Sequence, residues 1–277
     1  MLEAAWSNSY QFLYVVNVTA LLNNILNLFK CLLLYLLTAI IRTGSMSIDR
    51  LLGGGIRSGM VTDIFGQSGA GKSQLCFMLC ANYAKYCRQE DTILFIDTVG
   101  TFRPERISEI AGTEKSNNIL NKIIFVRALS TADQINAIKR IPDINARLTI
   151  IDTATSLFSD EFTGVTRHIV LRKHLHRLSL TAINFDCAIV ITNMIRSVPI
   201  RTTIIDEDGH NLTTAIKTII NSFQQREFME ASLSIYTHMK LKLEVISLEK
   251  SLFRASLIQP PRKEQVLYTI TSKGIAD

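Results

Sequence analysis

Short apolar runs alternate with stretches of helical spacing along most of the chain. Four mostly apolar runs are predicted to form strands, the last of them buried: residues 61–65, 92–97, 123–127 and 148–152. Helical spacing follows the first and third runs, at residues 74–87 and 131–140, and Pro104 suits the first turn of a helix after the second. Strands that alternate with helices form a parallel sheet with right-handed crossovers. The pattern therefore predicts an α/β fold with a mainly parallel central sheet flanked by helices.

The C-terminal part of the chain shows a different pattern, in which apolar and polar residues alternate. Alternation with a period of two is typical of strands that have one exposed face. It predicts strands at residues 240–243, 251–257 and 266–271. We expect these strands to extend the central sheet.

Residues 1–41 differ from the rest of the chain in charge and in pattern. Their only charged residues are Glu3 and Lys30. Between residues 12 and 29, Asn17, Asn24 and Asn27 fall near one face of a predicted amphipathic helix. The apolar run at residues 31–41 is too short to span a membrane, which takes about 20 residues. We interpret this leader as a helix that docks on the core or on a neighbouring subunit. A membrane-surface anchor and a segment outside the functional protein are the alternatives.

Composition and charge narrow the class of protein. Of the 277 residues, 47% are hydrophobic, which is typical of a folded chain and excludes a disordered one. A net charge of +6 is compatible with a polyanionic partner. The cysteines form no C-x-x-C pair and no metal-binding spacing, so we expect reduced, mostly buried thiols: Cys31, Cys76, Cys80, Cys87 and Cys187.

The strongest chemical signal is a glycine-rich turn between the first predicted strand and its helix. It has the spacing of a phosphate-binding loop, and we expect all of its residues to hold ATP: Gly66, Gln67, Ser68, Gly69, Ala70, Gly71, Lys72 and Ser73. The glycines let backbone N–H groups surround an anion, and the start of the following helix adds partial positive charge. Lys72 can reach the β- and γ-phosphates, and the Ser73 hydroxyl can bind Mg²⁺.

A second nucleotide motif is predicted at the end of the fourth strand. Asp152 follows an apolar run, and the carboxyl ends of parallel strands are where α/β proteins bind ligands. There a carboxylate can hold Mg²⁺ through water beside the phosphates. We therefore predict Ser73 and Asp152 as the metal site.

From Arg42 onward the chain resembles the RecA/RadA recombinases, in particular the archaeal RadA type and its paralogues. Several motifs carry the resemblance in order: Thr43-Gly44-Ser45, residues 51–56, the loop with Gln74, residues 96–98 and 100–106, Ile151-Asp152 with Ser156, residues 174–176, 190–193 and 268–275. The resemblance implies a RecA-like core that binds ATP between subunits, binds single-stranded DNA and acts in recombinational repair. It places Gln74 in the nucleotide site and Arg106 against the adenine base.

Two departures from the RadA pattern bear on catalysis. Val99 occupies the position of the RadA glutamate that activates water, and valine has no proton acceptor. Met194 occupies the position of a glutamine that senses the γ-phosphate, and methionine offers no comparable hydrogen bond. We predict ATP binding with slow hydrolysis and name no catalytic residue. The alternative is that Asp97 or Asp160 replaces the missing base.

The candidate DNA-binding residues are fewer than in RadA. They are Arg167 and the helix that carries Arg172, then Arg196 and Arg201, which we expect in a loop after Met194. That helix could equally present a solvated outer face. Phosphate contacts need cations on accessible backbone, so we expect single-stranded DNA binding that is weak or mediated by a partner.

The sequence as a whole predicts a core at residues 42–277 that is similar to RadB-like RadA paralogues. We expect a cytoplasmic accessory factor that uses ATP and Mg²⁺ and has RadA recombinase or another paralogue as its partner. A homo-oligomer is possible, membrane association is not expected, and no RadA-type polymerisation segment is recognised before Arg42. The alternatives are an active DNA-dependent strand-exchange ATPase and a KaiC-like signalling ATPase. A membrane-anchored ATP-binding protein is a third.

Overall fold

The computed structural model describes residues 38–112, 116–199 and 223–277. The structure therefore does not describe the leader up to residue 37, which includes Cys31, or Arg201. The chain divides into two units after Ala39, and the second unit, Ile40–Asp277, is the one described below. Its helices are α2 Met46–Leu51, α3 Lys72–Tyr86, α4 Pro104–Ala111, α5 Ser116–Leu120, α6 Thr131–Lys139, α7 Ser156–Glu161, α8 Gly164–Asn184 and α10 Glu230–Leu233.

The strands of this unit form one large sheet and a small one. The large sheet has the order β12-β11-β10-β9-β3-β7-β6-β4-β5, with β8 paired to β7, and the small sheet pairs β1 with β2. The strands are β1 Ile40–Ile41, β2 Ile56–Arg57, β3 Val61–Gly66, β4 Thr92–Asp97, β5 Ile123–Arg127, β6 Ala146–Asp152, β7 Ala188–Pro199, β8 Phe223–Glu227, β9 Met239–Ser247, β10 Leu252–Gln259, β11 Gln265–Thr271 and β12 Gly274–Ala276.

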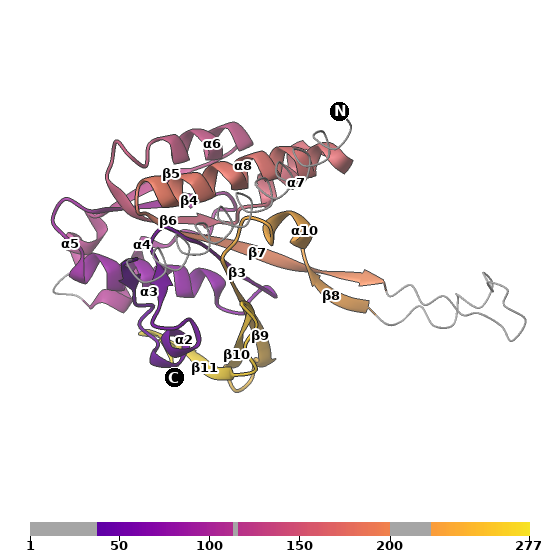
Figure 1. Cartoon of the computed structure of the whole chain (residues 1–277). Coiled ribbons are helices and arrows are strands. Elements are labelled where there is room, and N and C mark those ends of the chain that lie inside the picture. The colour runs from indigo at the N-terminus through magenta and orange to yellow at the C-terminus, as the bar shows by residue number, and fades with distance from the viewer. Residues whose placement is uncertain (1–37, 113–115, 200–222) are drawn as a thin grey trace, which may run out of the picture. The chain divides into compact units, whose positions relative to one another are not determined.

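The central part of the large sheet is parallel, as the sequence predicts. Strand β3 pairs in parallel with β7 on one side and with β9 on the other, and β7, β6, β4 and β5 continue the parallel part. Helices cover both faces of it: α3 and α4 lie on one side, and α6, α7 and α8 on the other (Figure 1). This is the α/β arrangement of a RecA-like core.

Strand β4 shows why these runs are apolar throughout. Ile93 and Phe95 belong to the core on the α3 side, whereas Leu94 and Ile96 belong to the core on the α8 side. Successive side chains of a strand point to opposite faces, so a strand covered by helices on both sides must be apolar at every position. Strand β3 is also buried throughout, although it carries the polar Thr62 and Asp63.

The C-terminal strands extend the sheet beyond β9. Strands β10, β11 and β12 follow it in an antiparallel meander, as the alternating pattern predicts. Tyr268 on β11 is buried, and its hydroxyl donates a hydrogen bond of 2.6 Å to the carbonyl oxygen of Ala70. The meander thereby contacts the segment between β3 and α3, where the phosphate-binding loop is predicted.

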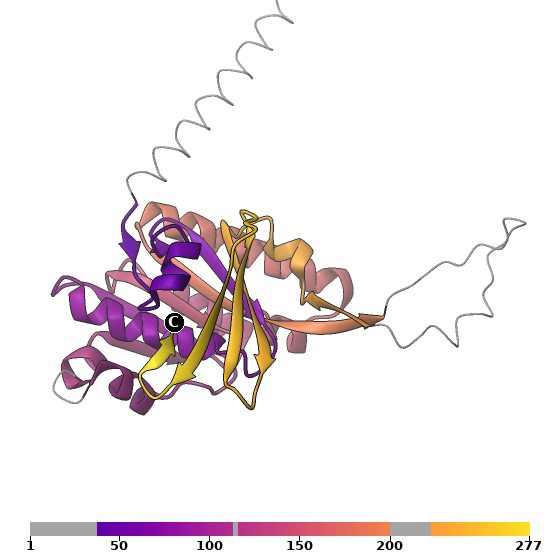
Figure 2. The same cartoon turned by 90° about the horizontal axis from the view of Figure 1, so that it is seen from below.

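Strand β7 contains the motif at residues 190–193 and extends beyond it. Beyond Met194 it continues to Pro199 and pairs with β8 in an antiparallel ribbon, Ile195–Pro199 with Phe223–Glu227. Figures 1 and 2 both show β7 and β8 running together away from the helices. The prediction that Arg196 lies in a loop was therefore wrong: it lies on β7, opposite Arg226. Its backbone finds a strand partner about thirty residues further along the chain, which no local pattern reveals.

Candidate nucleotide-binding site

The predicted phosphate-binding loop connects β3 to α3. At three of its positions the structure shows why glycine is required. Gly69 and Gly71 have φ angles of 78° and 87°, in the left-handed region that favours glycine. A Cβ atom on Gly66 would lie 2.0 Å from the carbonyl oxygen of Leu243 on β9. The loop thus has the conformation in which backbone N–H groups can surround an anion at the start of α3.

Lys72 lies against the loop that precedes it. Its Nζ donates hydrogen bonds of 2.9 and 2.7 Å to the carbonyl oxygens of Gly66 and Gln67. Burial lowers the pKa of Lys72, and the nearby Asp152 carboxylate opposes that shift. The ammonium group is therefore positioned where a bound phosphate would compete with two backbone carbonyls for it.

Ser73 and Asp152, the predicted metal site, contact each other. The Ser73 hydroxyl donates a 2.6 Å hydrogen bond to Oδ2 of Asp152, which also accepts one from Thr101 at 3.0 Å. The hydroxyl of Thr192 on β7 donates to Oδ1 of the same carboxylate. A hydroxyl beside an oriented carboxylate is the donor set that Mg²⁺ takes together with nucleotide phosphates. The described residues contain no group of three or more His, Cys, Asp or Glu side chains suited to a metal ion, so Mg²⁺ here would depend on phosphate ligands.

These residues line one cleft of about 510 Å³. Its polar lining includes Ser68, Lys72, Ser73 and Asp152, and the lining also has an apolar part. Pockets of this size suit a small-molecule ligand. The apolar side chains of the cleft are Val99, Met194, Ile195 and Ile270.

Val99 and Met194 face the cleft, so the two departures from the RadA pattern lie where the reaction would take place. Val99 is 43% exposed, and neither side chain can accept a proton. The one carboxylate among the described lining residues is Asp152, which already accepts three hydroxyl hydrogen bonds.

Asp97 is one of the two proposed substitutes for the missing base. Its carboxylate is occupied by hydrogen bonds and an ion pair within the fold. Its Oδ1 accepts hydrogen bonds from the backbone amides of residues 99–101, and its Oδ2 accepts one from Phe102. It also forms a 3.0 Å ion pair with Arg127 and is 1% exposed. Asp160, the other substitute, is exposed on α7 and does not line the cleft. Neither carboxylate is therefore placed to activate water beside the phosphates.

Arg106 and Gln74 contact each other at the side of the site. Arg106 Nε donates a 2.9 Å hydrogen bond to Oε1 of Gln74, and its guanidinium also donates to the carbonyl oxygens of Thr271 and Ser272. Glu109 forms an ion pair with it at 2.7 Å. Arg106 thus joins α4 to the turn after β11, and its place against the adenine stays a prediction.

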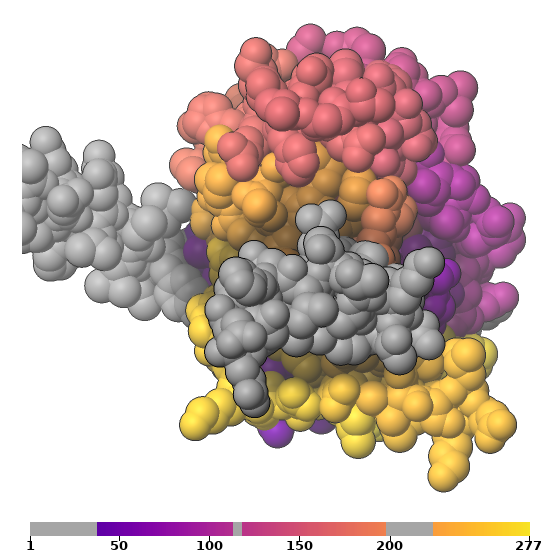
Figure 3. All heavy atoms as spheres, turned by 90° about the vertical axis from the view of Figure 1, so that its right-hand side faces the viewer, coloured from indigo at the N-terminus to yellow at the C-terminus, as the bar shows by residue number. Residues whose placement is uncertain are grey.

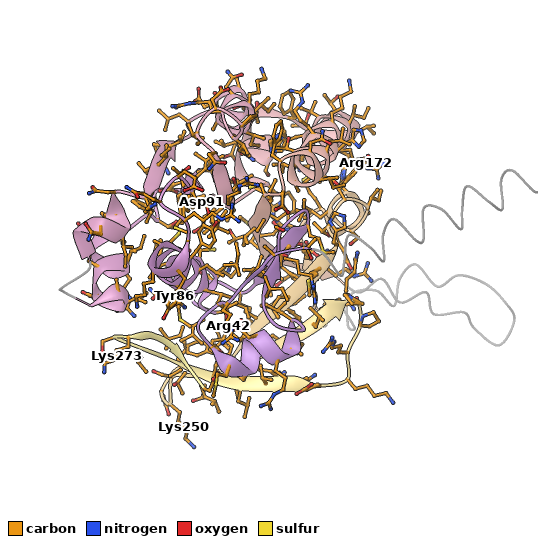
Figure 4. The ribbon with its side chains drawn as sticks, turned by 60° about the vertical axis from the view of Figure 1, so that its left-hand side comes forward. Arg42, Tyr86, Asp91, Arg172, Lys250 and Lys273 are labelled. Carbon is orange, nitrogen blue, oxygen red and sulfur yellow. The ribbon has the colours of Figure 1, made fainter. Side chains whose placement is uncertain are left out.

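Two of the candidate DNA-binding arginines, Arg167 and Arg196, come together at Ser159 and Phe228. Arg167 donates to the carbonyl oxygens of Phe162 and Ser159, so its guanidinium is engaged within α7 and α8. Arg172 is exposed on α8. Figure 4 shows it at the upper right, whereas Lys250 and Lys273 lie at the lower left.

The ribbon carries an arginine pair that sequence reasoning missed. Arg196 and Arg226 are cross-strand partners on β7 and β8. The Arg196 guanidinium stacks on Phe228, 3.6 Å from the ring centroid, and Arg226 donates to Gln224. Neither arginine has an ion pair with a described carboxylate. Two adjacent arginines without acidic partners can bind an anion.

A buried charged cluster lies at the base of the ribbon, and no sequence signal indicated it. Lys240 on β9 forms an ion pair with Glu227 on β8, and its Nζ lies 3.5 Å from Oδ2 of Asp63 on β3. Asn193 donates a 3.1 Å hydrogen bond to Glu227. Burial and the neighbouring Glu227 raise the pKa of Asp63 well above its ordinary value, which favours the neutral acid. The cluster links the strand before the phosphate loop to the ribbon.

The fold and the site together define a class: a P-loop nucleotide-binding protein with a RecA-like core. Comparison with known families then gives the family. The chain matches the Rad51 family over residues 37–212, which is more than half of its length. It belongs to that family, and the recognition of a RecA/RadA-type protein from its motifs is confirmed.

Three archaeal relatives carry the same description, DNA repair and recombination protein RadA. The Metallosphaera sedula protein is 35% identical over 173 residues, which cover 57% of this chain and 53% of the relative. The Cenarchaeum symbiosum protein is 36% identical over 175 residues, 57% of this chain and 43% of the relative. The Aeropyrum pernix protein is 35% identical over 173 residues, which cover 57% of this chain and 54% of the relative. The chain thus spans about half the length of the curated relatives it matches.

Proposed function

We propose that this protein is an ATP-binding RadA paralogue, similar to RadB-like proteins, that assists homologous recombination and hydrolyses ATP slowly. One observation carries the proposal. The cleft combines residues of the phosphate-binding loop and Asp152 with the apolar side chains of Val99 and Met194. The relatives described as DNA repair and recombination proteins support a role in recombination.

The residues that would hold the nucleotide are those of the loop. The backbone N–H groups of residues 66–73 would surround the β- and γ-phosphates, and Lys72 would leave its two carbonyl partners to bind them. Ser73 and Asp152 would hold Mg²⁺, which neutralises phosphate charge. Two left-handed glycines, an ammonium group on the loop and a hydroxyl beside a carboxylate fit these ligands.

Slow hydrolysis follows from the apolar side chains in the cleft. Water becomes a competent nucleophile when a positioned base accepts its proton, and the loss of that base lowers the rate by about 10²- to 10⁴-fold. Val99 cannot accept a proton, and Asp97 is fully engaged by backbone amides. The bound state would therefore last longer than one hydrolytic turnover of a RadA-type recombinase.

DNA contact and partners complete the proposal. The Arg196–Arg226 pair provides a small cationic surface, whereas the guanidinium of Arg167 is engaged in the fold. Few phosphate contacts give weak, salt-sensitive binding of single-stranded DNA. We infer that the protein acts together with RadA recombinase or another paralogue, or as an oligomer of its own.

Two measurements on one preparation of the full chain test this function. ATP affinity is measured by titration calorimetry with Mg²⁺, and phosphate release is measured with and without a thymidine oligonucleotide. We expect binding with very slow release in both conditions, and loss of binding in Lys72→Ala. Fast release stimulated by the oligonucleotide would instead identify an active recombinase, and no binding by the unmodified chain would refute the proposal.

A further inference from the structure

The phosphate loop and the ribbon touch through two glutamine side chains. Gln67 Nε2 donates a 2.8 Å hydrogen bond to Oε1 of Gln225 on β8. The two residues are 158 positions apart in the chain, and neither the loop nor the ribbon requires this contact for its own backbone pairing. It connects the nucleotide site directly to the strand that carries Arg226.

At the loop end, the contact is next to an interaction that phosphate would change. Lys72 Nζ donates to the carbonyl oxygen of the same Gln67, at 2.7 Å. A bound phosphate is the stronger acceptor for an ammonium group, because its negative charge attracts the ammonium in addition to accepting a hydrogen bond, whereas a carbonyl oxygen carries no net charge. Phosphate binding would therefore release the Gln67 carbonyl and let its peptide unit and side chain move.

At the ribbon end, β8 is held in place at Glu227, two residues after Gln225. Glu227 lies on the same side of β8 as Gln225, since side chains alternate along a strand. Lys240 and Asn193 hold Glu227 in the buried cluster at the base of the ribbon. Strand β8 is therefore anchored at Glu227 and contacts the loop at Gln225, so a displacement of Gln67 changes the direction in which the ribbon leaves the core.

The opposite side of the ribbon carries the arginine pair. Arg226 lies between Gln225 and Glu227 and so points to the other side of β8, across from Arg196. Like charges placed side by side on a sheet repel each other, and their spacing depends on how the two strands are held. Figure 3 shows the orange surface around α10 between α8 above and the C-terminal strands below, on the side of the molecule where the ribbon leaves the core.

The apolar side chains that line the cleft cannot make such a connection through hydrogen bonds. Met194, at the point where β7 passes from the sheet into the ribbon, has an apolar side chain and cannot carry a hydrogen bond from phosphate. We propose that Gln225 is a positioning residue that transmits phosphate binding at the loop to the Arg196–Arg226 pair through Gln67. This inference rests on the nucleotide binding proposed above.

Hydrogen exchange tests the coupling without depending on ATP turnover. The full chain is labelled with and without Mg²⁺ and an ATP analogue that cannot be hydrolysed, and exchange is read at the amides of residues 223–227. We expect the analogue to change their exchange in the unmodified chain, and this change to disappear in Gln225→Ala. Gln224→Ala is the matched control, because Gln224 lies on the other side of β8, beside Arg226, and this variant should keep the response.

Oligonucleotide binding gives a second reading. The affinity for a thymidine oligonucleotide is measured with and without the analogue in each variant. The ratio of the two affinities should be about 5-fold or more in the unmodified chain and in Gln224→Ala, and close to 1 in Gln225→Ala. The affinity for the analogue alone should change by less than about 3-fold in Gln225→Ala, because one exposed neutral hydrogen bond contributes little.

The outcomes separate the inference from the function on which it rests. If the unmodified chain does not bind the analogue, the proposed function fails and the coupling fails with it. If the analogue binds but the exchange of β8 does not respond, or if Gln225→Ala responds as the unmodified chain does, the proposed function stands and the role of Gln225 is refuted.

Discussion

The side chain at position 99 decides which chemistry the cleft can perform. Val99 is 43% exposed and faces the cleft, so a longer side chain can extend into it without displacing the core. Val99→Glu supplies a proton acceptor on the side where water would attack. We expect phosphate release to rise by on the order of 10²-fold or more, measured on the full chain with saturating ATP and Mg²⁺.

Val99→Gln is the control for this substitution. Glutamine has nearly the same shape as glutamate but cannot act as a base at neutral pH, so its rate should stay near that of the unmodified chain. Equal rates in both variants would show that the size of the side chain, and not its basicity, controls turnover. An unchanged rate in Val99→Glu would contradict the assignment of position 99.

At the scale of elements, the buried cluster between β3, β8 and β9 predicts a pH dependence. Asp63 is fully buried, and neither of its carboxylate oxygens accepts a hydrogen bond within the described chain. Burial, then repulsion from Glu227, raises its pKa well above the ordinary 3.8. Above pH 3.8 the unfolded chain loses this proton while the folded chain keeps it, so the contribution of Asp63 to stability declines as the pH rises toward its folded pKa.

Asp63→Asn should remove this decline. The free energy of unfolding of the variant, relative to the unmodified chain, should increase steadily from about pH 4 upward, by at most about 1.4 kcal/mol per pH unit. Urea unfolding at a series of pH values measures it. Asp160→Asn, which changes an exposed aspartate outside the buried cluster, is the control. A pH-independent difference for Asp63→Asn would mean that Asp63 is ionised in the folded protein.

The elements also show how far the sequence could predict this structure. Strands β4 and β5 match the expected residues 92–97 and 123–127, because both runs are mostly apolar. Strand β4 is buried between helices, whereas β5 is the partly exposed edge strand of the sheet. The ribbon escaped prediction because its second strand, Phe223–Glu227, contains two glutamines and an arginine and has no apolar alternation. Its pairing is decided by the tertiary structure, and the place of Arg196 and Gln225 is decided with it.

The candidate site divides in the same way. The spacing of glycines, Lys72 and Ser73 reveals the loop, since its function depends on local backbone geometry. Asp152 could be placed beside Ser73 because parallel strands end at one edge of the sheet. The ion pair of Lys240 with Glu227 joins two strands whose charged residues look like solvent-exposed ones in the sequence, so only the fold reveals it.

For the molecule as a whole, the nucleotide would bridge segments that are far apart in the chain. The cleft is lined from the loop, from β6 and β7, and from Ile270 on β11. A ligand that binds only the folded state stabilises it by about 2.7 kcal/mol at one hundred times its Kd. We therefore expect ATP with Mg²⁺ to raise the unfolding temperature of the full chain by roughly 5–10 °C, measured by calorimetry.

Removal of the metal tests the part played by Ser73. With EDTA present the shift caused by ATP should be smaller, because the carboxylate of Asp152 then faces the phosphates without a cation between them. Ser73→Ala should show the same small shift with or without EDTA, as one Mg²⁺ ligand is missing. A full Mg²⁺-dependent shift in Ser73→Ala would contradict the proposed metal site.

The described chain contains no helix long and apolar enough to cross a membrane. The prediction that the leader does not span the bilayer concerns residues outside those described, and it stays a prediction.

The apolar side of the cleft has a consequence for how such a protein could respond to its surroundings. A recombinase that hydrolyses ATP is driven in one direction around a cycle, so its nucleotide and DNA states need not be at equilibrium. With Val99 and Met194 in the cleft, nucleotide exchange would be the main event, and occupancy would follow the cellular ratio of ATP to ADP by mass action. Thermodynamic reciprocity then applies: whatever factor ATP contributes to DNA affinity, DNA must return to ATP affinity.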